Sequence, residues 1–380
     1  MLYDFITYYK YLMDGEIELF EYTFEQPQKI IFKENSIEDF FSHTPQKSLL
    51  IADSFFRESS IIKSFPDFQN NVLFITPGEP DVDSITRISQ SIGRPVEHIY
   101  AMGGGSCIDT AKIIRLMLEQ RCSLDKITIT ESTEHAVTLT AVPTTPATGS
   151  EVTKFAVYSK NMLKTTLIGS CLIPDTAYID SSFTDQIPHH ILTISVADAL
   201  SHCTEAILSK TANDISDTLA SKGISIISKY LLFPGEESKK QLIKASCIGG
   251  LCINYASVCE GHLMGHLIAS LLHLPHGKSV GILLPAVIEY NRRYKNEKIK
   301  IISKIFGTTE DKCPDMVFDM LKNAGLYDNL NTQPYKNISD KITEPLWYEG
   351  SSFICSQPFE DAQKHELYSI FLNYLELIRV

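Results

Sequence analysis

Histidines in the second half of the sequence have the types and spacing of metal ligands. Asp198 and His202 are four residues apart within a helical pattern, as are His262 and His266, so each pair projects from one face of its helix. His276 lies in a Pro-His-Gly turn that could return towards these helices. One carboxylate and several imidazoles, without a thiolate, suit Fe²⁺ or Zn²⁺. We therefore predict one divalent metal site formed by Asp198, His202, His262 and His276.

A glycine-rich turn in the first half of the chain has the chemistry of a diphosphate site. Residues 103–106 (GGGS) follow an apolar run and precede a helical pattern. Glycines let the backbone approach a ligand closely, and the N–H groups at a helix start favour an anion. The motif is not the GxGxxG fingerprint and does not follow the first strand, so a structural tight turn is the alternative.

Two further polar features follow predicted strands. Asp53 ends the first clear strand pattern, where a carboxylate can accept from a ribose 2′-hydroxyl and would repel a 2′-phosphate. Asp53 therefore favours NAD over NADP, with a surface turn aspartate as the alternative. Residues 142–153 (VPTTPATGSEVT) bring several hydroxyls to the end of another strand. Ligands of parallel α/β sheets bind at the carboxyl ends of strands, so this segment suits a ligand crevice.

The elements that would position these residues differ between the two halves. Short aliphatic runs alternate with helical stretches in the first half, at 48–53, 72–76, 98–102 and 136–142. This βαβ spacing predicts a mostly parallel sheet covered on both faces. Residues 21–33 are interpreted as an antiparallel edge element with a proline at its bend.

Long helical periodicity replaces the strand pattern in the second half. Helices are predicted at 191–209, 217–232, 239–256, 262–272 and 280–290. We predict an NAD-binding α/β domain over 1–185, with 1–17 as an N-terminal extension, and an all-helical metal-binding domain over 186–380. No low-complexity linker separates the halves, so we expect them to pack closely around a cleft.

Composition narrows the class of protein. The 380 residues carry 34 Lys and Arg against 46 Asp and Glu, a formal net charge of −12. Non-specific nucleic-acid binding needs a basic face, so no nucleic-acid partner is expected. No apolar run approaches the roughly 18 residues of a membrane span, and the N-terminus does not fit a signal peptide. We expect a cytoplasmic protein whose nine scattered cysteines are free thiols.

Four segments resemble one known family. They are GGGSCIDTAK (103–112), PTTPATGSEVT (143–153), DALSHCTEA (198–206) and the GH-x3-H-x9-HG run (261–277). Together they resemble the iron-containing, or group III metal-dependent, alcohol dehydrogenases, over about residues 25–375. The resemblance implies an α/β N-terminal dinucleotide-binding domain with a Rossmann-like sheet and an all-α C-terminal metal-binding domain, the dehydroquinate synthase-like architecture. It also implies that cofactor and metal meet between the domains, and that the protein is a homodimer.

The resemblance gives the motif residues specific roles. It implies that Asp198, His202, His262 and His276 bind the metal and that His266 lies near the nicotinamide, where it acts as a proton relay or a positioning group. For the cofactor it implies Gly104, Gly105, Ser106 and Asp109 at the diphosphate, Thr144, Thr145 and Thr148 around the ribose and nicotinamide, Lys164 on the ribose, and Asp53 as the NAD-selecting carboxylate.

The leading hypothesis is an NAD(H)-linked oxidoreductase that interconverts a primary alcohol and its aldehyde by hydride transfer, with the metal as Lewis acid. Lys154 departs from members acting on short alcohols, and a basic residue there suggests a phosphonoacetaldehyde reductase as an alternative. A lyase resembling dehydroquinate synthase, which uses NAD transiently, is a second alternative, although that family binds its metal with a glutamate and two histidines. A non-catalytic binding protein on the same scaffold is a third.

Overall fold

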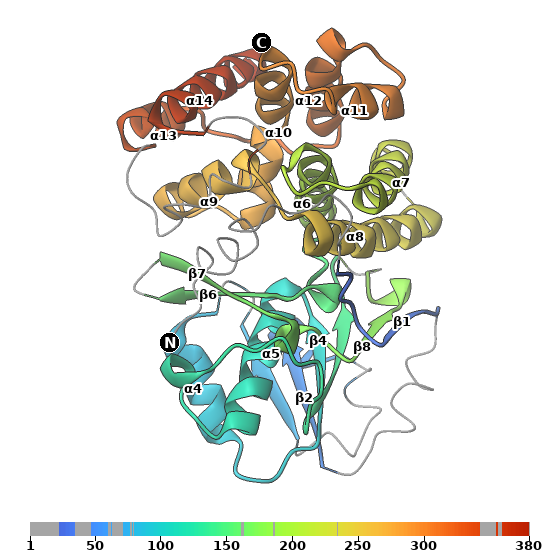
Figure 1. Cartoon of the computed structure of the whole chain (residues 1–380), viewed down its shortest axis with the longest axis vertical. Coiled ribbons are helices and arrows are strands. Elements are labelled where there is room, and N and C mark those ends of the chain that lie inside the picture. The colour runs from blue at the N-terminus through green and yellow to red at the C-terminus, as the bar shows by residue number, and fades with distance from the viewer. Residues whose placement is uncertain are drawn as a thin grey trace. The chain divides into compact units, whose positions relative to one another are not determined.

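A computed structural model of the chain describes residues 23–34, 47–59, 62, 71–76, 78, 80–160, 163–184, 187–233, 235–342, 355 and 359–379. The expected N-terminal extension, 1–17, lies outside these residues. The chain divides into two compact units (Figure 1). The first unit is Met1–Thr145 with Gly149–Gln186, and the second is Pro146–Thr148 with Ile187–Val380.

A parallel sheet forms the centre of the first unit. Its six strands have the order β1-β8-β5-β4-β2-β3. They are β1 (Lys29–Phe32), β2 (Ser48–Asp53), β3 (Val72–Ile75), β4 (His98–Gly103), β5 (Thr138–Pro143) and β8 (Thr176–Ile179). The four predicted aliphatic runs form β2, β3, β4 and β5, and all described pairs in this sheet are parallel.

The expectation of an antiparallel element over residues 21–33 is wrong. Within that range β1 is an edge strand, but it pairs in parallel with β8, with Lys29 opposite Thr176 and Phe32 opposite Ile179. A two-residue side-chain period identifies a strand without giving its direction. Direction depends on the partner strand, and the partner here, β8, lies in a segment that the aliphatic pattern did not identify.

Both faces of the sheet are apolar towards the carboxyl ends of the strands. Helix α5 (Gly105–Gln120) packs on β4 and β5, over a core that includes Ile51, Ile99 and Leu139. The alternate residues, among them Tyr100 and Val142, form the core of the opposite face. Helix α4 (Val82–Ser91) begins where Asp81 accepts from the Ser84 amide at 2.6 Å. An antiparallel ribbon of β6 (Phe155–Lys160) and β7 (Leu163–Ile168) was not predicted.

The second unit is helical, as predicted. Its helices are α6 (His189–Leu208), α7 (Asp214–Tyr230), α8 (Glu236–Ala256), α9 (Glu260–Leu272), α10 (His276–Arg293), α11 (Ile299–Ile305), α12 (Cys313–Asn323), α13 (Gln333–Asn337) and α14 (Asp361–Glu376). Short 3₁₀ turns occur in both units. Those of the first unit are η1 (Ser54–Phe56), η3 (Leu124–Lys126), η4 (Ser150–Val152), η5 (Ser170–Leu172) and η6 (Ser181–Thr184). Those of the second unit are η7 (Glu310–Lys312), η8 (Ser339–Lys341) and η10 (Leu377–Arg379). An α/β unit and an all-helical unit confirm the predicted fold class.

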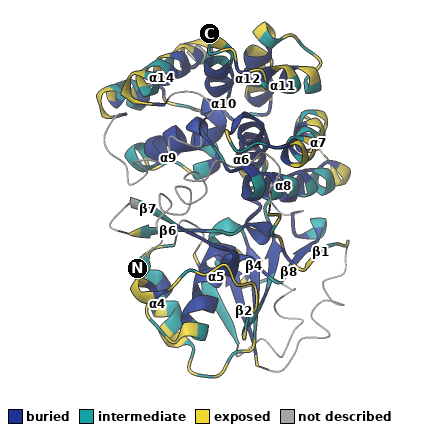
Figure 2. Cartoon of the chain, viewed as in Figure 1, coloured by how far each residue is buried: buried dark blue, intermediate teal, exposed yellow. Residues whose placement is uncertain are grey.

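Helix α6 is the central element of the second unit. It packs against α7, α8, α9 and α10, and Figure 2 shows it almost entirely buried. By length and composition α6 could cross a membrane, and so could the pair α8 and α9 if its 111° bend is ignored. However, 83% of the apolar window of α6 is buried inside the structure. A helix with few charged residues that is buried along most of its length is the expected centre of a helical core. All nine cysteines are free, as expected.

Candidate functional site

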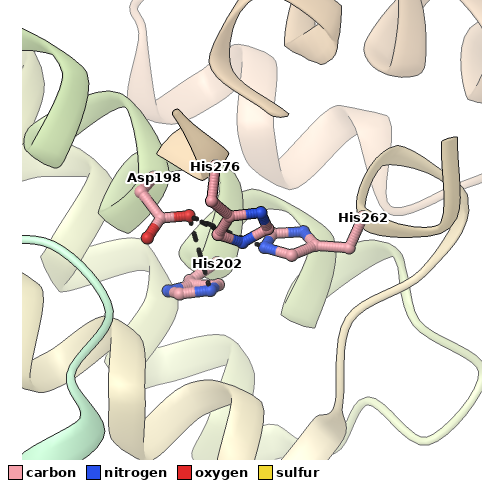
Figure 3. Close-up of side chains that lie close together, drawn as sticks. All are labelled: Asp198, His202, His262 and His276. Carbon is pink, nitrogen blue, oxygen red and sulfur yellow. Dashed lines mark ion pairs between the residues drawn. The ribbon is translucent and has the colours of Figure 1, made fainter. Parts of the chain in front are cut away.

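Three helices of the second unit bring the four predicted metal ligands together (Figure 3). Asp198 and His202 come from α6, His262 from α9 and His276 from the start of α10. One potential ligand atom from each residue lies within 4.8 Å of the others. Asp198 Oδ1 is 3.8 Å from His202 Nε2, 3.7 Å from His262 Nε2 and 3.5 Å from His276 Nε2. We call these four residues the metal centre.

The sequence around His276 explains how α10 reaches α6. His276 is the first residue of α10 rather than part of a free turn, and Pro275 precedes it as the N-cap. A Cβ atom added to Gly277 would lie 2.4 Å from the Ile194 carbonyl oxygen and 3.1 Å from Asp198 Cβ. Only glycine allows this contact, so the His-Gly pair places an imidazole directly beside the Asp198 carboxylate.

The metal centre has the properties of a cation site. Asp198 is 1% exposed, and His202 and His262 are each 4% exposed. Among the residues that the structure describes, Asp198 Oδ1 and His262 Nε2 are buried without a hydrogen-bond partner. Buried polar atoms are normally paired. Unpaired oxygen and nitrogen atoms that converge within this distance therefore fit a divalent metal such as Fe²⁺ or Zn²⁺.

The ionisation of these side chains also suits a metal. Burial opposes ionisation of Asp198, but the imidazoles of His202 and His276 outweigh burial and hold its pKa below the usual range. Burial lowers the pKa of His202 to about 4, so its ring is neutral at pH 7. Burial also opposes protonation of His262, but Glu205 and Asp198 raise its pKa to about 9. A metal ion that binds His262 must displace this proton.

Glu205 is a functional residue that the sequence analysis missed. Its Oε1 lies 2.6 Å from His262 Nδ1, and its Oε2 accepts from the backbone amides of Cys259 at 2.9 Å and His262 at 3.0 Å. These bonds direct His262 Nε2 towards Asp198, as outer carboxylates do for histidine ligands. The signal was present, because residues 198, 202 and 205 follow i, i+4, i+7 spacing and share one face of α6.

His266 lies beside the metal centre and is not among its four convergent residues. It follows His262 by one turn of α9, and its ring centroid is 4.7 Å from that of His276 at an interplanar angle of 90°. The distance to the His262 ring centroid is 6.2 Å. The structure therefore places His266 where a group could exchange a proton with a molecule bound at the metal centre.

The predicted glycine loop, residues 103–106, connects β4 to α5 in the first unit. Gly103 ends β4, and Gly104 is the N-cap of α5. An added Cβ would lie 2.6 Å from Cys107 Cβ at Gly103 and 3.3 Å from Thr145 Oγ1 at Gly104. Close packing thus requires glycine at position 103, and Gly105 and Ser106 supply the first amides of the helix.

Asp53 lies against this loop. Its Oδ2 accepts from the Gly104 amide at 3.1 Å. Its Oδ1 is buried and has no hydrogen-bond partner among the described residues. Burial raises the pKa of the carboxyl group, and the bond from Gly104 partly offsets that rise. One oxygen of Asp53 is thus without a partner among the described residues, and its ribose contact stays a prediction.

Asp109 makes contacts that the sequence did not indicate. It accepts from the Ser150 hydroxyl and, at 3.0 Å, from the Val157 amide. Lys112, which is fully buried, lies 3.6 Å from Asp109 and donates to the Phe155 carbonyl oxygen at 2.7 Å. Asp109 and Lys112 therefore hold the segment that leads into β6, and a diphosphate contact of Asp109 stays a prediction.

The remaining predicted cofactor residues are distributed over both units. Thr144 donates its amide to the Gly103 carbonyl oxygen at 3.0 Å, and the Thr145 hydroxyl lies against Gly104. Lys164 is on β7, in the first unit. Thr148 belongs to the second unit. The structure thus gathers Thr144 and Thr145 with the glycine loop, and the cofactor contacts of Thr148 and Lys164 stay predictions.

Comparison with protein families gives two matches that together cover most of the chain. Residues 27–181 match the model described as "Iron-containing alcohol dehydrogenase". Residues 193–340 match "Fe-containing alcohol dehydrogenase family, C-terminal". The boundary between these matches lies close to the change from the α/β to the helical unit.

Relatives and solved structures agree with these matches. "Probable alcohol dehydrogenase EutG" of Escherichia coli is 31% identical over 63% of this chain, which spans 63% of that relative's length. "NADPH-dependent butanol dehydrogenase" of Clostridium saccharobutylicum is 29% identical over 70% of this chain, and the match covers 74% of that relative's length. The structure of sulfoacetaldehyde reductase from Bifidobacterium kashiwanohense in complex with NAD⁺ has a TM-score of 0.79 and 22% identity, covering 93% of this chain and 99% of that one. Alcohol dehydrogenase from Oenococcus oeni has a TM-score of 0.80 and 20% identity, covering 93% and 100%.

Proposed function

Because the chain belongs to the iron-containing alcohol dehydrogenase family, we propose that it interconverts a primary alcohol and its aldehyde, with NAD(H) as the hydride carrier and one divalent metal, Fe²⁺ or Zn²⁺. The observation that carries this proposal is the metal centre, where four potential ligand atoms lie within 4.8 Å of one another. The names of the relatives, which include an alcohol dehydrogenase and a butanol dehydrogenase, support the same class of reaction.

The residues in and around the metal centre have different roles in this proposed reaction. A divalent metal bound there supplies a Lewis acid that lowers the pKa of the substrate hydroxyl. Asp198 provides the one negative charge of the ligand set, so net positive charge remains for the substrate oxygen. Glu205 holds the orientation of His262. Bound NAD⁺ would supply the hydride acceptor for oxidation of the alcohol, and His266 would carry the hydroxyl proton towards solvent.

The glycine loop and Asp53 support NAD(H) as the partner of this reaction. The first amides of α5 suit a diphosphate, and the unpaired Oδ1 of Asp53 suits a ribose hydroxyl. One relative is named NADPH-dependent, so the family alone does not decide between the two cofactors. We expect kcat/KM to be higher with NADH than with NADPH, and Asp53→Gly to reduce this preference. A wild-type preference for NADPH would contradict the assignment of Asp53.

The decisive experiment for the reaction is an aldehyde panel combined with metal analysis of the purified protein. We expect stoichiometric NADH oxidation with at least one aldehyde and NAD⁺ reduction with the matching alcohol. Net NADH formation distinguishes a dehydrogenase from a lyase that uses NAD transiently, and the ligand set of one aspartate and three histidines also favours the dehydrogenase. Metal-loaded protein that binds NADH and turns over no aldehyde would instead indicate a binding protein.

An anionic aldehyde is the second candidate substrate class. Lys154 lies just before β6 in the first unit, and a net charge of −12 makes a local cation necessary for an anionic substrate. A fold relative is named sulfoacetaldehyde reductase, which acts on such a molecule. Phosphonoacetaldehyde, sulfoacetaldehyde and butyraldehyde should therefore be compared with wild type and Lys154→Met. A selective loss of activity towards the two anions would favour this candidate, and equal loss towards all three would remove it.

We further propose a cytoplasmic homodimer that acts on a small molecule and does not bind nucleic acid or membranes. The family resemblance supports the dimer, and the acidic charge supports the absence of a nucleic-acid partner. Light scattering coupled to size-exclusion chromatography measures the assembly, and a mass of one chain would contradict it.

A further inference from the structure

A pocket lies at the amino ends of the strands, away from the edge that carries the glycine loop. It has a volume of about 490 Å³ and is formed within the first unit. Lys29, Thr138 and Thr176 line it as the first residues of β1, β5 and β8. His135 and Asp175, just before β5 and β8, complete its inner wall. The volume falls within the range of about 300–1,000 Å³ that is typical of small-molecule sites.

The floor of this pocket is a row of polar side chains in register. Thr140 lies opposite Thr176, which lies opposite Lys29 on the edge strand. Residues in register on parallel strands share a face and are about 4.8 Å apart. Two residues further along β5 and β8 this face carries Val142 and Tyr178, which belong to an apolar core. Parallel strands are normally apolar on both faces, so the hydroxyl row is a local departure that packing does not explain.

His135 lies in the wall of the pocket, where Glu119 holds its ring. Its Nδ1 lies 3.0 Å from Glu119 Oε2, and Glu119 Oε1 accepts from the Val137 amide at 2.9 Å. Burial opposes ionisation of Glu119, but His135 and the Val137 amide lower its pKa, so Glu119 is a carboxylate that accepts from its neighbours. The His135 side chain is only 3% exposed. Its Nε2 is buried without a hydrogen-bond partner among the described residues.

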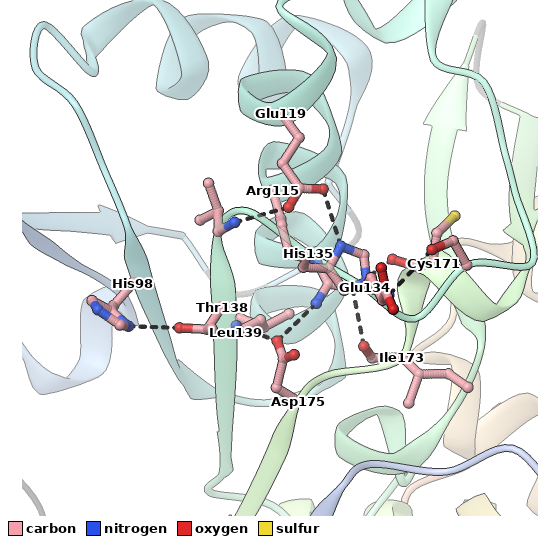
Figure 4. Close-up of polar contacts among 12 residues, drawn as sticks. His98, Arg115, Glu119, Glu134, His135, Thr138, Leu139, Cys171, Ile173 and Asp175 are labelled. Atoms are coloured by element: carbon pink, nitrogen blue, oxygen red, sulfur yellow. Dashed lines mark hydrogen bonds and ion pairs between the residues drawn. The ribbon is translucent and has the colours of Figure 1, made fainter.

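The buried guanidinium group of Arg115 holds Asp175 in position. Its Oδ2 accepts from the Leu139 amide at 2.7 Å and from Arg115 Nη1 at 3.2 Å. Arg115 is fully buried in α5 and also donates to the Ile173 carbonyl oxygen at 3.0 Å. Figure 4 shows Glu119 and Arg115 reaching from the same helix towards His135 and Asp175. The charge of Asp175 is therefore balanced inside the protein, and its position does not depend on a ligand.

The charges of the pocket indicate a neutral ligand. Lys29 and Glu134 have opposite signs and lie at its exposed rim, where solvent screens them. The less exposed part offers threonine hydroxyls and one internally balanced carboxylate, with the His135 ring beside them. No aromatic side chain lines the pocket among the described residues, which argues against a flat ring as ligand. Groups that both donate and accept match such a surface, and hydroxyl groups have this property.

We propose that this pocket binds a small, neutral, polyhydroxylated molecule of the sugar or sugar-alcohol class. Hydroxyl groups of the ligand bond the Thr140 and Thr176 hydroxyls and the Asp175 carboxylate, beside the ring of His135. The site is independent of the proposed reaction, because its residues belong to neither the metal centre nor the glycine loop.

The test is ligand-observed NMR titration of the full chain with glycerol, xylitol, D-ribose, D-glucose and, as a zwitterionic comparison, L-serine. Thr140→Val and Thr176→Val each remove one hydroxyl at nearly constant shape. Thr86→Val is the matched control, because Thr86 bonds only within α4, to the Val82 carbonyl oxygen. The titration is repeated with His276→Ala, since a polyol could also bind the metal centre as an alcohol. Circular dichroism confirms that each variant is folded.

We expect at least one polyol to bind saturably in wild type, in Thr86→Val and in His276→Ala. Thr140→Val and Thr176→Val should each weaken that binding about five- to tenfold, the effect of losing one hydrogen bond. Should neither variant fold, the His135 ring nitrogen resonances of the wild type provide the readout, and they must shift on polyol addition. Absence of saturable polyol binding, its loss in His276→Ala, indifference to both threonine variants, or binding of L-serine alone would each overturn the proposal.

Discussion

The metal centre and the glycine loop are built by opposite means. The metal centre gathers side chains from three helices and leaves Asp198 Oδ1 and His262 Nε2 buried without a hydrogen-bond partner among the described residues. The glycine loop works by the absence of side chains, because a Cβ at Gly103 would collide with Cys107 and Asp53. One region is specified by the atoms it presents, and the other by the space that it keeps free.

This difference predicts different responses to substitution. Removing a metal ligand takes away a bond to the ion and leaves the remaining charges unbalanced in a buried site. Adding a methyl group to the glycine loop introduces a steric conflict in the first unit without touching any metal ligand. Variants of the two regions should therefore separate metal content from cofactor binding.

The largest effect is expected from His276→Ala. This ligand is the most exposed of the four, with 25% of its side chain accessible, so its removal should leave the fold intact. We expect loss of bound metal and of nearly all turnover, measured by elemental analysis and NADH oxidation. His273→Ala, at the exposed end of α9, is the control and should retain both. Full turnover in metal-free His276→Ala would show that this side chain is not a required ligand.

His266→Gln should have the next largest effect, on turnover alone. A proton-transfer group contributes about 10²–10⁴-fold, so kcat should fall within that range. Metal content should stay at the wild-type level, because His266 is not one of the four convergent residues. Loss of metal from this variant would mean that His266 belongs to the ligand set.

Glu205→Gln tests the support of the metal centre. A glutamine cannot accept the two backbone amide bonds and the His262 bond at the same time with the same strength. We expect metal affinity to fall about 10–100-fold, measured by competition with a chelator. Glu260→Gln is a matched control, since Glu260 is an equally buried carboxylate that bonds Asn291 instead of a histidine ligand. Equal losses in both variants would indicate a general packing effect.

The smallest effect is expected from Gly103→Ala. The added Cβ would lie 2.6 Å from Cys107 Cβ, and such overpacking costs about 1–3 kcal/mol of unfolding free energy. We expect weaker NADH binding, measured by fluorescence titration, with unchanged metal content. Gly93→Ala is the control, because nothing lies within 4 Å of its added Cβ. Loss of metal from Gly103→Ala would contradict the independence of the two regions.

The sequence predicted the metal centre more completely than the sheet. Helical spacing placed Asp198 and His202 on one face, and no long-range information was needed for that step. The direction of β1 depends on its pairing with β8, a segment far away in the chain, which local patterns do not record. Strands β6 and β7 pair locally, with Lys160 opposite Leu163, but this segment was not interpreted as strands. Glu205 was missed because a carboxylate within a helix is usually solvated, and its burial follows only from the position of α9.

The central claim is that the four convergent side chains bind a metal required for alcohol and aldehyde interconversion. The most direct measurement removes metal with a chelator and then restores Fe²⁺ or Zn²⁺ in steps, following bound metal and NADH oxidation with an active aldehyde. We predict that activity rises in proportion to bound metal and saturates at one ion per chain, the capacity of the one four-residue cluster found among the described residues. Undiminished activity in the metal-free protein would contradict the claim.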